Sequence, residues 1–562
     1  MTNAKRQPAA SVSGPLQWSE IGAGLLLTAA VIYLQVTAWL SAGPLWRDEA
    51  TSVNVVNLPS LWTMWVDGGR WDSFPALWHT LLRGWSAVGL GSSDLALRAS
   101  GLAVGVGTLA ALWWAVRQLG GKAPLVSLLL LGLSPVFLVS GGSVRAYGLG
   151  VLTLLLAAAA IWRMVNQPSW GRVVFAACAS LLCVHSVFPN CIMLLALCLG
   201  ATAVAVRRRH WRAAITVLAG GALAGASMLV YLQSAAQRKE WDVIMQYPVN
   251  LPYFTAAFLE TVSESASWMI WVWLALLVLV TLSGVYLAFR PARPVTPDLR
   301  ELPLFAFVIL VTGTACFAAY LDLLKYAVTA RYFLPLIGLG ALCLDAGLVP
   351  LMRSSAVTRQ VLPVAIALLA AGSFPSALAA AHTRMTNVDE AARQVERSAG
   401  PGDLMVVDPW FLGVTVQRYY HGAAPWVTLP DFEQRMFQPA PDFKARMAEV
   451  RPLVPVLRRV QGVLESGHRL WLLGNTRFLA PGQSPMCLPP APQSPYGWRM
   501  SAYTADWSCQ LGDLLQRHAR SITLIPIPDL PFVNVDEKVR LVVVDGWQQP
   551  AYGAGAEGQS SP

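Results

Sequence analysis

The sequence predicts a polytopic α-helical membrane protein of about eleven spans that ends in an extracytoplasmic α/β domain. Three observations lead to this fold class. The chain of 562 residues is 55% hydrophobic and only 13% charged, whereas soluble domains carry roughly 25% charged residues. Apolar runs long enough to cross about 30 Å of hydrocarbon recur along the first 380 residues. Beyond that point, charged residues and prolines become more frequent.

Eleven segments are expected to cross the membrane. They cover residues 21–41, 98–116, 124–140, 148–165, 172–187, 189–206, 213–233, 268–289, 302–320, 332–350 and 360–380. The fifth and sixth meet at HSVFPN and are expected to form a hairpin with a tight outer turn; ten or twelve spans are alternatives. The 23 tryptophans suit chain segments at the level of the lipid headgroups.

The basic residues indicate the orientation. With residues 1–20 as a cytoplasmic segment, alternate connections carry few acids, namely Glu20, Asp298 and Glu301. The basic residues of the same connections are Lys5, Arg6, Arg117, Lys122, Arg163, Arg172, Arg207, Arg208, Arg209, Arg212, Arg290, Arg293, Arg300, Arg353 and Arg359. This excess follows the positive-inside rule and accounts for the net charge of +10, so no nucleic-acid partner is expected. We expect a multi-pass protein of the bacterial inner membrane with its C-terminal domain in the periplasm or outside the cell.

The first outer loop, residues 42–97, is the longest insertion between the early spans. It contains LWRDEA and two short apolar stretches, LPSLWTMWV and FPALWHTLLRGW. Both stretches are typical of helices that lie flat on the membrane surface.

Residues 381–552 are expected to form the outer α/β domain. Apolar strands DLMVVD, RLWLLG, TLIPI and VRLVVVD alternate with helices near 388–398, 411–420, 442–465 and 508–519. Strands that are apolar throughout suggest a sheet covered on both faces. Residues 553–562 are expected to be disordered. Cys487 and Cys509 are expected to form a disulfide if this domain lies in an oxidising compartment.

Asp48 and Glu49 lie a few residues after the end of the first predicted span and are the first candidates for catalysis. Adjacent carboxylates do not face the same way on a helix, so one can act while the other orients. The alternative is a solvated pair of acids beside Arg47.

Cations at the outer edge of later spans are the second group of candidates. Arg145 and Tyr147 lie between the third and fourth spans, and Lys325, Arg331 and Tyr332 lie before the tenth. Basic residues on this side run against the positive-inside bias. An outer anion such as a phosphate would explain them, because arginine offers it a bidentate fork. Snorkelling side chains are the alternative.

Other polar residues leave two interpretations open. His185, polar within an apolar hairpin, is as compatible with a bonded core histidine as with a site residue. His79 is expected to be interfacial, and Asp94 and Arg98 are expected to form a pair at the membrane edge.

The order of these motifs resembles that of a known enzyme family. The stretches are WRDEATS, FPALWHTLLRGWSAVGLGSSDLALRASG, SPVFLVSGGSVRAYGL, VHSVFPN and ARYFLPL, and the tail segment PGDLMVVDPW resembles tails of some members. Over residues 20–380 the chain resembles membrane glycosyltransferases of the GT-C superfamily, in particular bacterial enzymes similar to protein O-mannosyltransferases and the lipid A aminoarabinose transferase.

The resemblance implies transfer of a hexosyl or pentosyl group on the outer face, with inversion at the anomeric carbon. It implies a polyprenyl-phosphate sugar donor, within the lipid bilayer, and a lipid, glycan or protein acceptor. Asp48 matches the general base, Glu49 its support or an acceptor ligand, and Arg331, with Lys325, the donor-phosphate site. Arg145 matches the arginine of the fourth-span motif.

Two positions differ from the family pattern. Ser143 stands where relatives often have an acid, and Ser73, Phe74 and Pro75 stand where relatives often have a histidine–proline pair. The sequence therefore gives no support for a metal or other cofactor, although the resemblance does not exclude a divalent metal.

Two other functions also fit an outer cavity lined by cations. A transporter or flippase of lipid-linked sugars would more often show broken helices and repeat symmetry, neither of which is visible in the sequence. A non-catalytic membrane scaffold that binds partners through its tail is the second alternative.

Overall fold

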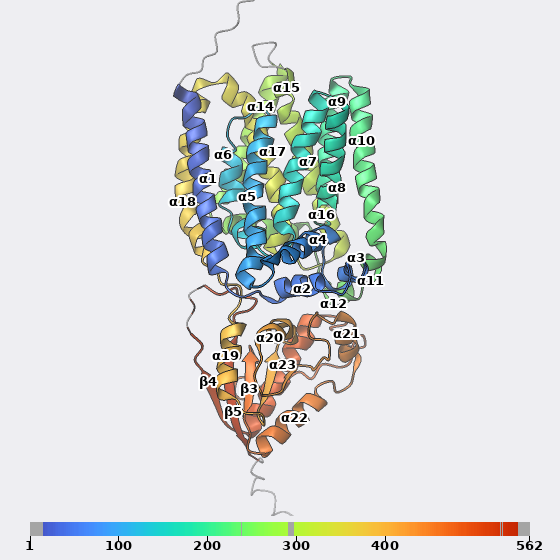
Figure 1. Cartoon of the computed structure of the whole chain (residues 1–562), viewed down its shortest axis with the longest axis vertical. Coiled ribbons are helices and arrows are strands. Elements are labelled where there is room, and N and C mark those ends of the chain that lie inside the picture. The colour runs from blue at the N-terminus through green and yellow to red at the C-terminus, as the bar shows by residue number, and fades with distance from the viewer. Residues whose placement is uncertain (1–14, 238, 290–296, 529, 531, 549–562) are drawn as a thin grey trace, which may run out of the picture.

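The computed structural model describes residues 15–548 except 238, 290–296, 529 and 531. Most of the expected N-terminal cytoplasmic segment and all of the expected disordered tail lie outside the described residues. A long helical part and a smaller C-terminal α/β part are stacked along the longest axis of the molecule (Figure 1). The expected combination of a helical membrane protein with a C-terminal sheet is thus confirmed.

Among the described residues, eight helices are long and apolar enough to cross a membrane. They contain α1 (Pro15–Ser41), α5 (Asp94–Gln118), α7 (Tyr147–Asn166), α9 (Asn190–Arg207), α10 (Trp211–Ala226), α16 (Leu302–Leu324), α17 (Leu334–Ser354) and α18 (Ala356–Ala381). Two shorter apolar helices, α8 (Trp170–Val184) and α14 (Met269–Phe289), lie among them, and α15 (Pro297–Arg300) precedes α16. All ten long or apolar helices fall on segments that the sequence marked as spans.

The expected span 124–140 is not one helix. It consists of α6 (Leu125–Ser127) and the π-helical segments η2 (Leu128–Gly132) and η3 (Phe137–Gly141). Pro135 lies at the break, where its ring and missing N–H prevent a continuous helix. Asp345 of α17 stabilises α6, because its carboxylate accepts hydrogen bonds from the backbone N–H groups of Val126 and Ser127, at 3.1 and 2.7 Å.

Glycines bring the segment after η3 close to its neighbours. A Cβ on Gly101 of α5 would lie 2.0 Å from the carbonyl oxygen of Gly142, and a Cβ on Gly148 of α7 would lie 1.9 Å from that of Gly141. Only glycine permits such close approach of two backbones. These contacts place the loop that carries Arg145 against α5 and α7.

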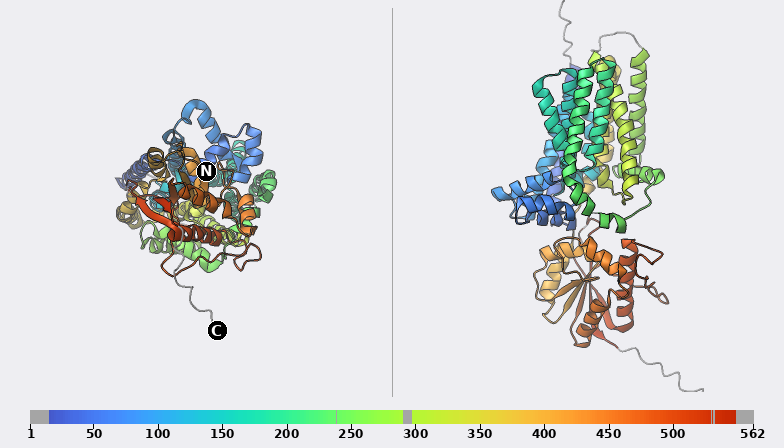
Figure 2. Two further views of the ribbon diagram at one scale, coloured as in Figure 1. Left: turned by 90° about the horizontal axis from the view of Figure 1, so that it is seen from below. Right: turned by 90° about the vertical axis from the view of Figure 1, so that its right-hand side faces the viewer.

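Short helices line the end of the helical part that faces the α/β part (Figures 1 and 2). The first outer loop forms α2 (Arg47–Val56), α3 (Leu61–Trp71), α4 (Ala76–Trp85) and η1 (Ser86–Leu90). The two flat helices expected in this loop correspond to α3 and α4, and the acidic motif itself begins α2. Later segments at this end form η4 (Ser227–Tyr231), α11 (Leu232–Gln237), α12 (Lys239–Ile244), α13 (Leu251–Ser263) and η5 (Ala330–Phe333).

The α/β part is built on a five-stranded sheet of order β2-β1-β3-β5-β4. The strands are β1 (Leu404–Asp408), β2 (Trp426–Thr428), β3 (Leu470–Gly474), β4 (Ala519–Ile525) and β5 (Arg540–Trp547); β1, β2 and β3 are parallel, and β5 runs antiparallel to β3 and β4. β1 and β3 are buried on both faces by separate clusters, which explains their uninterrupted apolar sequences.

The elements of this part differ from the sequence expectation in one helix and one strand. The helices are α19 (Val388–Ser398), η6 (Trp410–Leu412), α20 (Gly413–Tyr419), α21 (Ala440–Ala448), α22 (Val454–Glu465) and α23 (Met500–His518). The single helix expected at 442–465 is two helices, because Pro452 lies in the break between them. The short strand β2 was not expected.

The expected disulfide is also wrong, since Cys487 and Cys509 are both free thiols. The Cys487 segment is held differently. The Asp506 carboxylate accepts hydrogen bonds from the backbone N–H groups of Cys487 and Leu488, both at 3.0 Å.

Candidate active site

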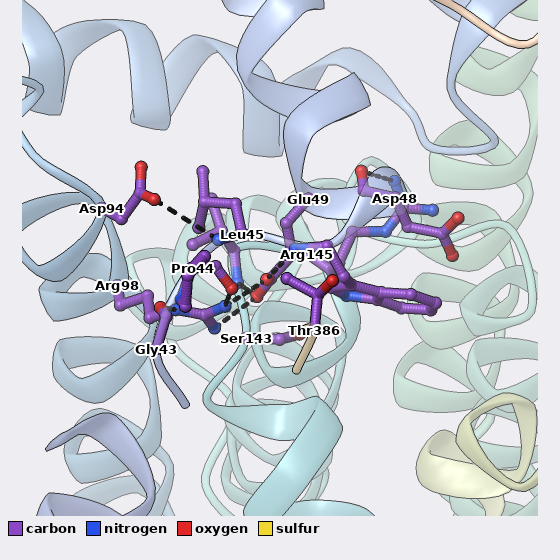
Figure 3. A network of polar contacts seen from close by, with 12 residues as sticks. Gly43, Pro44, Leu45, Asp48, Glu49, Asp94, Arg98, Ser143, Arg145 and Thr386 are labelled. Atoms are coloured by element: carbon purple, nitrogen blue, oxygen red, sulfur yellow. Dashed lines mark hydrogen bonds and ion pairs between the residues drawn. The ribbon is translucent and has the colours of Figure 1, made fainter. Parts of the chain in front are cut away.

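Asp48 and Glu49 lie in the first turn of α2, and their side chains point in different directions (Figure 3). A helix N-terminus favours acidic side chains there, because its free N–H groups carry partial positive charge. Glu49 is completely buried, whereas the Asp48 side chain is 15% exposed. The two carboxylates therefore have different surroundings.

Both oxygens of Glu49 are occupied by protein groups. Arg98 of α5 donates to Oε1 at 2.8 Å and to Oε2 at 2.6 Å, and the Val144 backbone N–H donates to Oε1 at 3.0 Å. Arg98 also bonds the carbonyl oxygens of Gly43 and Pro44. This buried pair ties together the acidic loop, α5 and the loop that carries Arg145. The expected Asp94–Arg98 pair is wrong, since Arg98 binds Glu49.

Asp48 faces another arginine. Its Oδ2 lies 3.3 Å from Nη2 of Arg331, and its Oδ1 lies 3.6 Å from Nε of Arg47. The Arg331 guanidinium stacks over the rings of Trp46 and Tyr332, and its buried Nε has no hydrogen-bond partner among the described residues. An arginine with a free donor beside a partly exposed carboxylate is suited to bind an anion.

Arg145 contacts the opposite side of the acidic turn. Its Nη1 donates to the Asp48 carbonyl oxygen at 2.8 Å, to Ser52 Oγ at 3.0 Å and to Asp72 Oδ1 at 2.8 Å. Its guanidinium lies over the ring of Phe74, 4.5 Å from the centroid. Because Arg145 is buried and binds the backbone of Asp48, it is placed to hold the turn.

Asp72 completes this support and was not among the predicted site residues. Besides the Arg145 ion pair, its Oδ2 accepts from Ser52 Oγ at 2.6 Å and lies 3.0 Å from His79 Nε2. Burial raises the pKa of Asp72, but Arg145, His79 and Ser52 together outweigh it and hold that pKa well below its ordinary value. His79, expected at the interface, is buried. In the sequence, the only indication of this role of Asp72 was its position between two apolar stretches that were expected to form surface helices.

Aromatic rings form a wall beside Arg331. Tyr147 and Tyr332 have ring centroids 6.3 Å apart, Phe74 meets Tyr147 edge-on at 5.0 Å, and Tyr326 lies 6.3 Å from Tyr332. Tyr147 and Tyr332, both predicted site residues, therefore lie in one cluster with Arg331. Tyr326 joins the cluster although the sequence analysis did not select it.

Two predicted residues lie in other surroundings. Lys325 is half exposed and its Nζ bonds Asp322 at 2.8 Å, three residues earlier in the chain. His185 lies 3.0 Å from Tyr231 Oη through Nδ1 and 3.0 Å from Ser227 Oγ through Nε2. Lys325 is not brought to Asp48, and His185 belongs to a bonded group at the hairpin, which fits the core interpretation.

Metal binding has no visible donor set. Among the described residues, no group of three or more histidine, cysteine, aspartate or glutamate side chains could hold a metal ion. The positions that differ from the family pattern lie in this region. Ser143 Oγ bonds the Ser140 carbonyl oxygen at 2.6 Å, and Phe74 packs on Arg145.

Two solved structures align with most of the chain at low sequence identity. ArnT from Cupriavidus metallidurans bound to undecaprenyl phosphate aligns with a TM-score of 0.49 and 13% identity over 94% of this chain and 98% of that chain. Archaeal oligosaccharyltransferase AglB from Archaeoglobus fulgidus, in complex with an inhibitory peptide and a dolichol-phosphate, aligns with a TM-score of 0.43 and 13% identity over 81% of this chain and 69% of that chain. No protein-family model and no curated protein matches the chain.

Proposed function

We propose that the protein is a glycosyltransferase that acts on the outer face of the membrane that it spans. It moves a hexosyl or pentosyl group from a polyprenyl-phosphate donor to a hydroxyl group. The observation that carries the proposal is the pairing of a partly exposed carboxylate, Asp48, with an arginine, Arg331, that has a buried free donor. Asp48 belongs to α2, which Figure 1 shows at the end of the helical part that faces the α/β part, and the ion pair places Arg331 beside it.

Asp48 is the general base in this mechanism. The acceptor hydroxyl gives its proton to the Asp48 carboxylate while its oxygen attacks the anomeric carbon of the donor. The bond between that carbon and the phosphate oxygen breaks, and the phosphate leaves on its lipid with the electron pair. Attack opposite the leaving group inverts the anomeric configuration.

Arg331 binds the donor phosphate. Charge grows on the leaving oxygen as the glycosidic bond breaks, and a guanidinium beside it stabilises that charge in the transition state. The free Nε of Arg331 and the surrounding rings of Trp46 and Tyr332 suit an anion attached to an apolar lipid. Arg145 and Glu49 hold the acidic turn through the contacts described above, and Tyr147 and Tyr332 line the site.

The orientation follows from the basic connections. The N-terminus is cytoplasmic, and the α/β domain lies on the periplasmic or extracellular side, next to the end of the helical part that carries α2. The acceptor is a lipid, a glycan or a protein that reaches this side.

The test is a transfer assay with the purified full-length protein in liposomes. A panel of polyprenyl-phosphate hexoses and pentoses, each labelled in the sugar, is supplied with outer-face lipid, glycan and peptide acceptors. Transfer from at least one donor is expected, with an inverted linkage by NMR. Movement of the intact labelled donor across the bilayer without transfer would identify the flippase alternative, and a retained linkage would contradict the single-displacement mechanism.

A further inference from the structure

The α/β domain reaches the first turn of α2 through the segment that precedes β5. Glu537 Oε1 accepts a hydrogen bond from the backbone N–H of Arg47 at 2.8 Å. The Asp536 carbonyl oxygen accepts another from Arg47 Nη1 at 3.2 Å, and the Arg47 guanidinium lies 4.3 Å from the ring centroid of Phe411. Two segments of the α/β domain therefore contact the residue next to Asp48.

The contact between Glu537 and Arg47 satisfies a specific need of the helix. The first N–H groups of an α-helix have no partner within it and require an acceptor from elsewhere. Arg47 is the first residue of α2, and its own N-cap, Trp46, has no side-chain acceptor for this purpose. A carboxylate there also complements the positive end of the helix.

Glu537 is rigidly placed. It is 1% exposed, and Thr415 Oγ1 of α20 donates to its two oxygens at 2.9 and 3.1 Å. Its segment pairs with the start of the domain, because the Arg384 N–H donates to the Phe532 carbonyl and the Asn534 N–H donates to the Arg384 carbonyl, at 2.6 and 2.9 Å. The acceptor therefore has a fixed position relative to the sheet.

A second contact holds the residue before Trp46. The Leu45 N–H donates to Tyr419 Oη at 2.6 Å, and Tyr419 in turn bonds Asp94. The intervening Trp46 N–H donates to Glu49 Oε2 at 3.4 Å. Three consecutive N–H groups thus have side-chain acceptors, and two of these acceptors belong to the α/β domain.

We propose that Glu537 is a positioning residue for the transfer reaction, which fixes the first turn of α2 and so holds the Asp48 carboxylate opposite Arg331. The inference rests on the proposed function and assigns the α/β domain a part in it. Without this acceptor, the Arg47 N–H is unpaired and the turn shifts. A displacement of about 1 Å at a reacting group can lower a rate by roughly 100-fold.

The experiment compares Glu537→Leu, Glu537→Gln and Asn54→Ala in the full-length protein. Glutamine keeps an oxygen acceptor for the Arg47 N–H, whereas leucine has none. Asn54→Ala is the matched control, because Asn54 Nδ2 bonds the Met436 carbonyl oxygen at 2.6 Å and so joins the same domain to the opposite end of α2. The readouts are kcat and KM for the donor, together with hydrogen–deuterium exchange of a peptide that covers residues 44–50.

Glu537→Leu is expected to lower kcat about 10- to 100-fold with KM changed less than about threefold, and to speed exchange of residues 44–50. Glu537→Gln and Asn54→Ala are expected to stay within about threefold of the wild type in kcat and to leave that exchange unchanged. Equal kcat losses in leucine and glutamine variants, or unchanged exchange in the leucine variant, would overturn the proposal.

If Glu537→Leu does not fold, Thr415→Val carries the test, because it removes the support of the carboxyl group and leaves Glu537 in place. Faster exchange of residues 44–50 with a severalfold lower kcat supports the proposal, and wild-type values of either overturn it. A wild-type protein that transfers no sugar from any donor contradicts the proposed function. The exchange measurement still decides whether Glu537 holds the turn.

Discussion

The two acids of the first turn of α2 lie in contrasting regions. Around Glu49, each carboxylate oxygen and each nitrogen of the facing Arg98 is bonded to protein groups, and the pair is closed to solvent. Around Asp48, the facing arginine has a buried nitrogen that finds no partner in the described part of the chain, and the carboxylate is partly exposed. Within this turn, the fully bonded Glu49–Arg98 pair thus serves structure, and the partly exposed Asp48–Arg331 pair suits substrate binding.

The largest effect is expected for Asp48→Asn. The amide cannot accept the hydroxyl proton, so transfer should fall about 100- to 10,000-fold. The folded protein should lose little stability, because the Asp48 backbone keeps its bond to Arg145 and the ion pairs of the carboxylate with Arg47 and Arg331 are partly exposed. Initial rates and a thermal unfolding curve check both statements. A rate close to that of the wild type would remove Asp48 from the role of base.

Glu49→Gln is expected to lower the stability of the fold, whereas Asp48→Asn is expected to lower the rate of transfer. The Glu49→Gln change leaves the Arg98 charge buried without a counter-charge, which should lower the stability of the fold by about 3 kcal/mol. Thermal unfolding of the purified protein measures the loss. Addition of Arg98→Met should recover part of it, because the unpaired charge is then removed. An unaltered unfolding temperature in Glu49→Gln would show that the Glu49–Arg98 pair does not stabilise the fold.

Arg331→Lys tests the open region from its other side. Lysine keeps the charge and loses the planar fork and the stacking on Trp46. We expect kcat/KM for the donor to fall roughly 30- to 100-fold. Kinetics with varied donor concentration check it, and Arg145→Lys is the comparison, since that residue is expected to affect the position of the turn and not donor binding.

A pH effect is expected at the contact between the domains. Burial raises the pKa of Glu537 to about 7, against the lowering influences of Arg47, Thr386 and Thr415 that face it. An acid whose pKa is raised by folding binds its proton more tightly in the folded protein. Its stabilising contribution is therefore complete below the unfolded pKa near 4.5 and is lost as the pH rises through about 7.

Between pH 5.5 and 7.5 this loss is roughly 2 kcal/mol. The Glu537→Gln side chain cannot titrate. As the pH rises through this range, the unfolding temperature of the variant should therefore increase relative to that of the wild type. Unfolding curves at several pH values measure the difference. Parallel pH profiles of the two proteins would contradict the assignment.

The smallest effect is expected for Lys325→Met. The lysine is half exposed and paired with Asp322, so transfer should change less than about twofold. A tenfold rise in the KM for the donor would show that Lys325 takes part in binding the donor phosphate, together with Arg331. The same steady-state assay distinguishes these results.

Sequence patterns predicted the positions of the long helices and singled out Asp48 and Arg331, which the structure pairs, but they gave Glu49 no partner. Apolar runs reveal helices directly, and Asp48, Arg145 and Arg331 were recognisable as charges at the outer ends of those runs. The Glu49–Arg98 pair joins residues 49 positions apart, and no local pattern pairs them. Asp94, closer to Arg98 along the chain, was the natural but wrong partner. It bonds Arg418 and Tyr419 of the α/β domain.

The remaining differences have local causes. The expected third span is interrupted at Pro135, a position whose effect on a membrane helix depends on neighbours such as Asp345 that no window of sequence contains. Strand β2 is only three residues long, which is too short for a periodic signal. Asp72 was overlooked because a single acid in a surface loop has no distinctive spacing.

The hydrogen bond between Arg47 and Glu537 joins residues 490 positions apart. During synthesis, the residues of α2 leave the ribosome early. The carboxylate of Glu537, which accepts a hydrogen bond from the Arg47 N–H, is made only when the polypeptide is almost complete. In the proposed orientation, a nascent chain completes the acidic turn only after the segment that carries Glu537 has crossed the bilayer and folded. Premature termination between residues 382 and 536 keeps the long apolar helices and leaves the acidic turn without its cap.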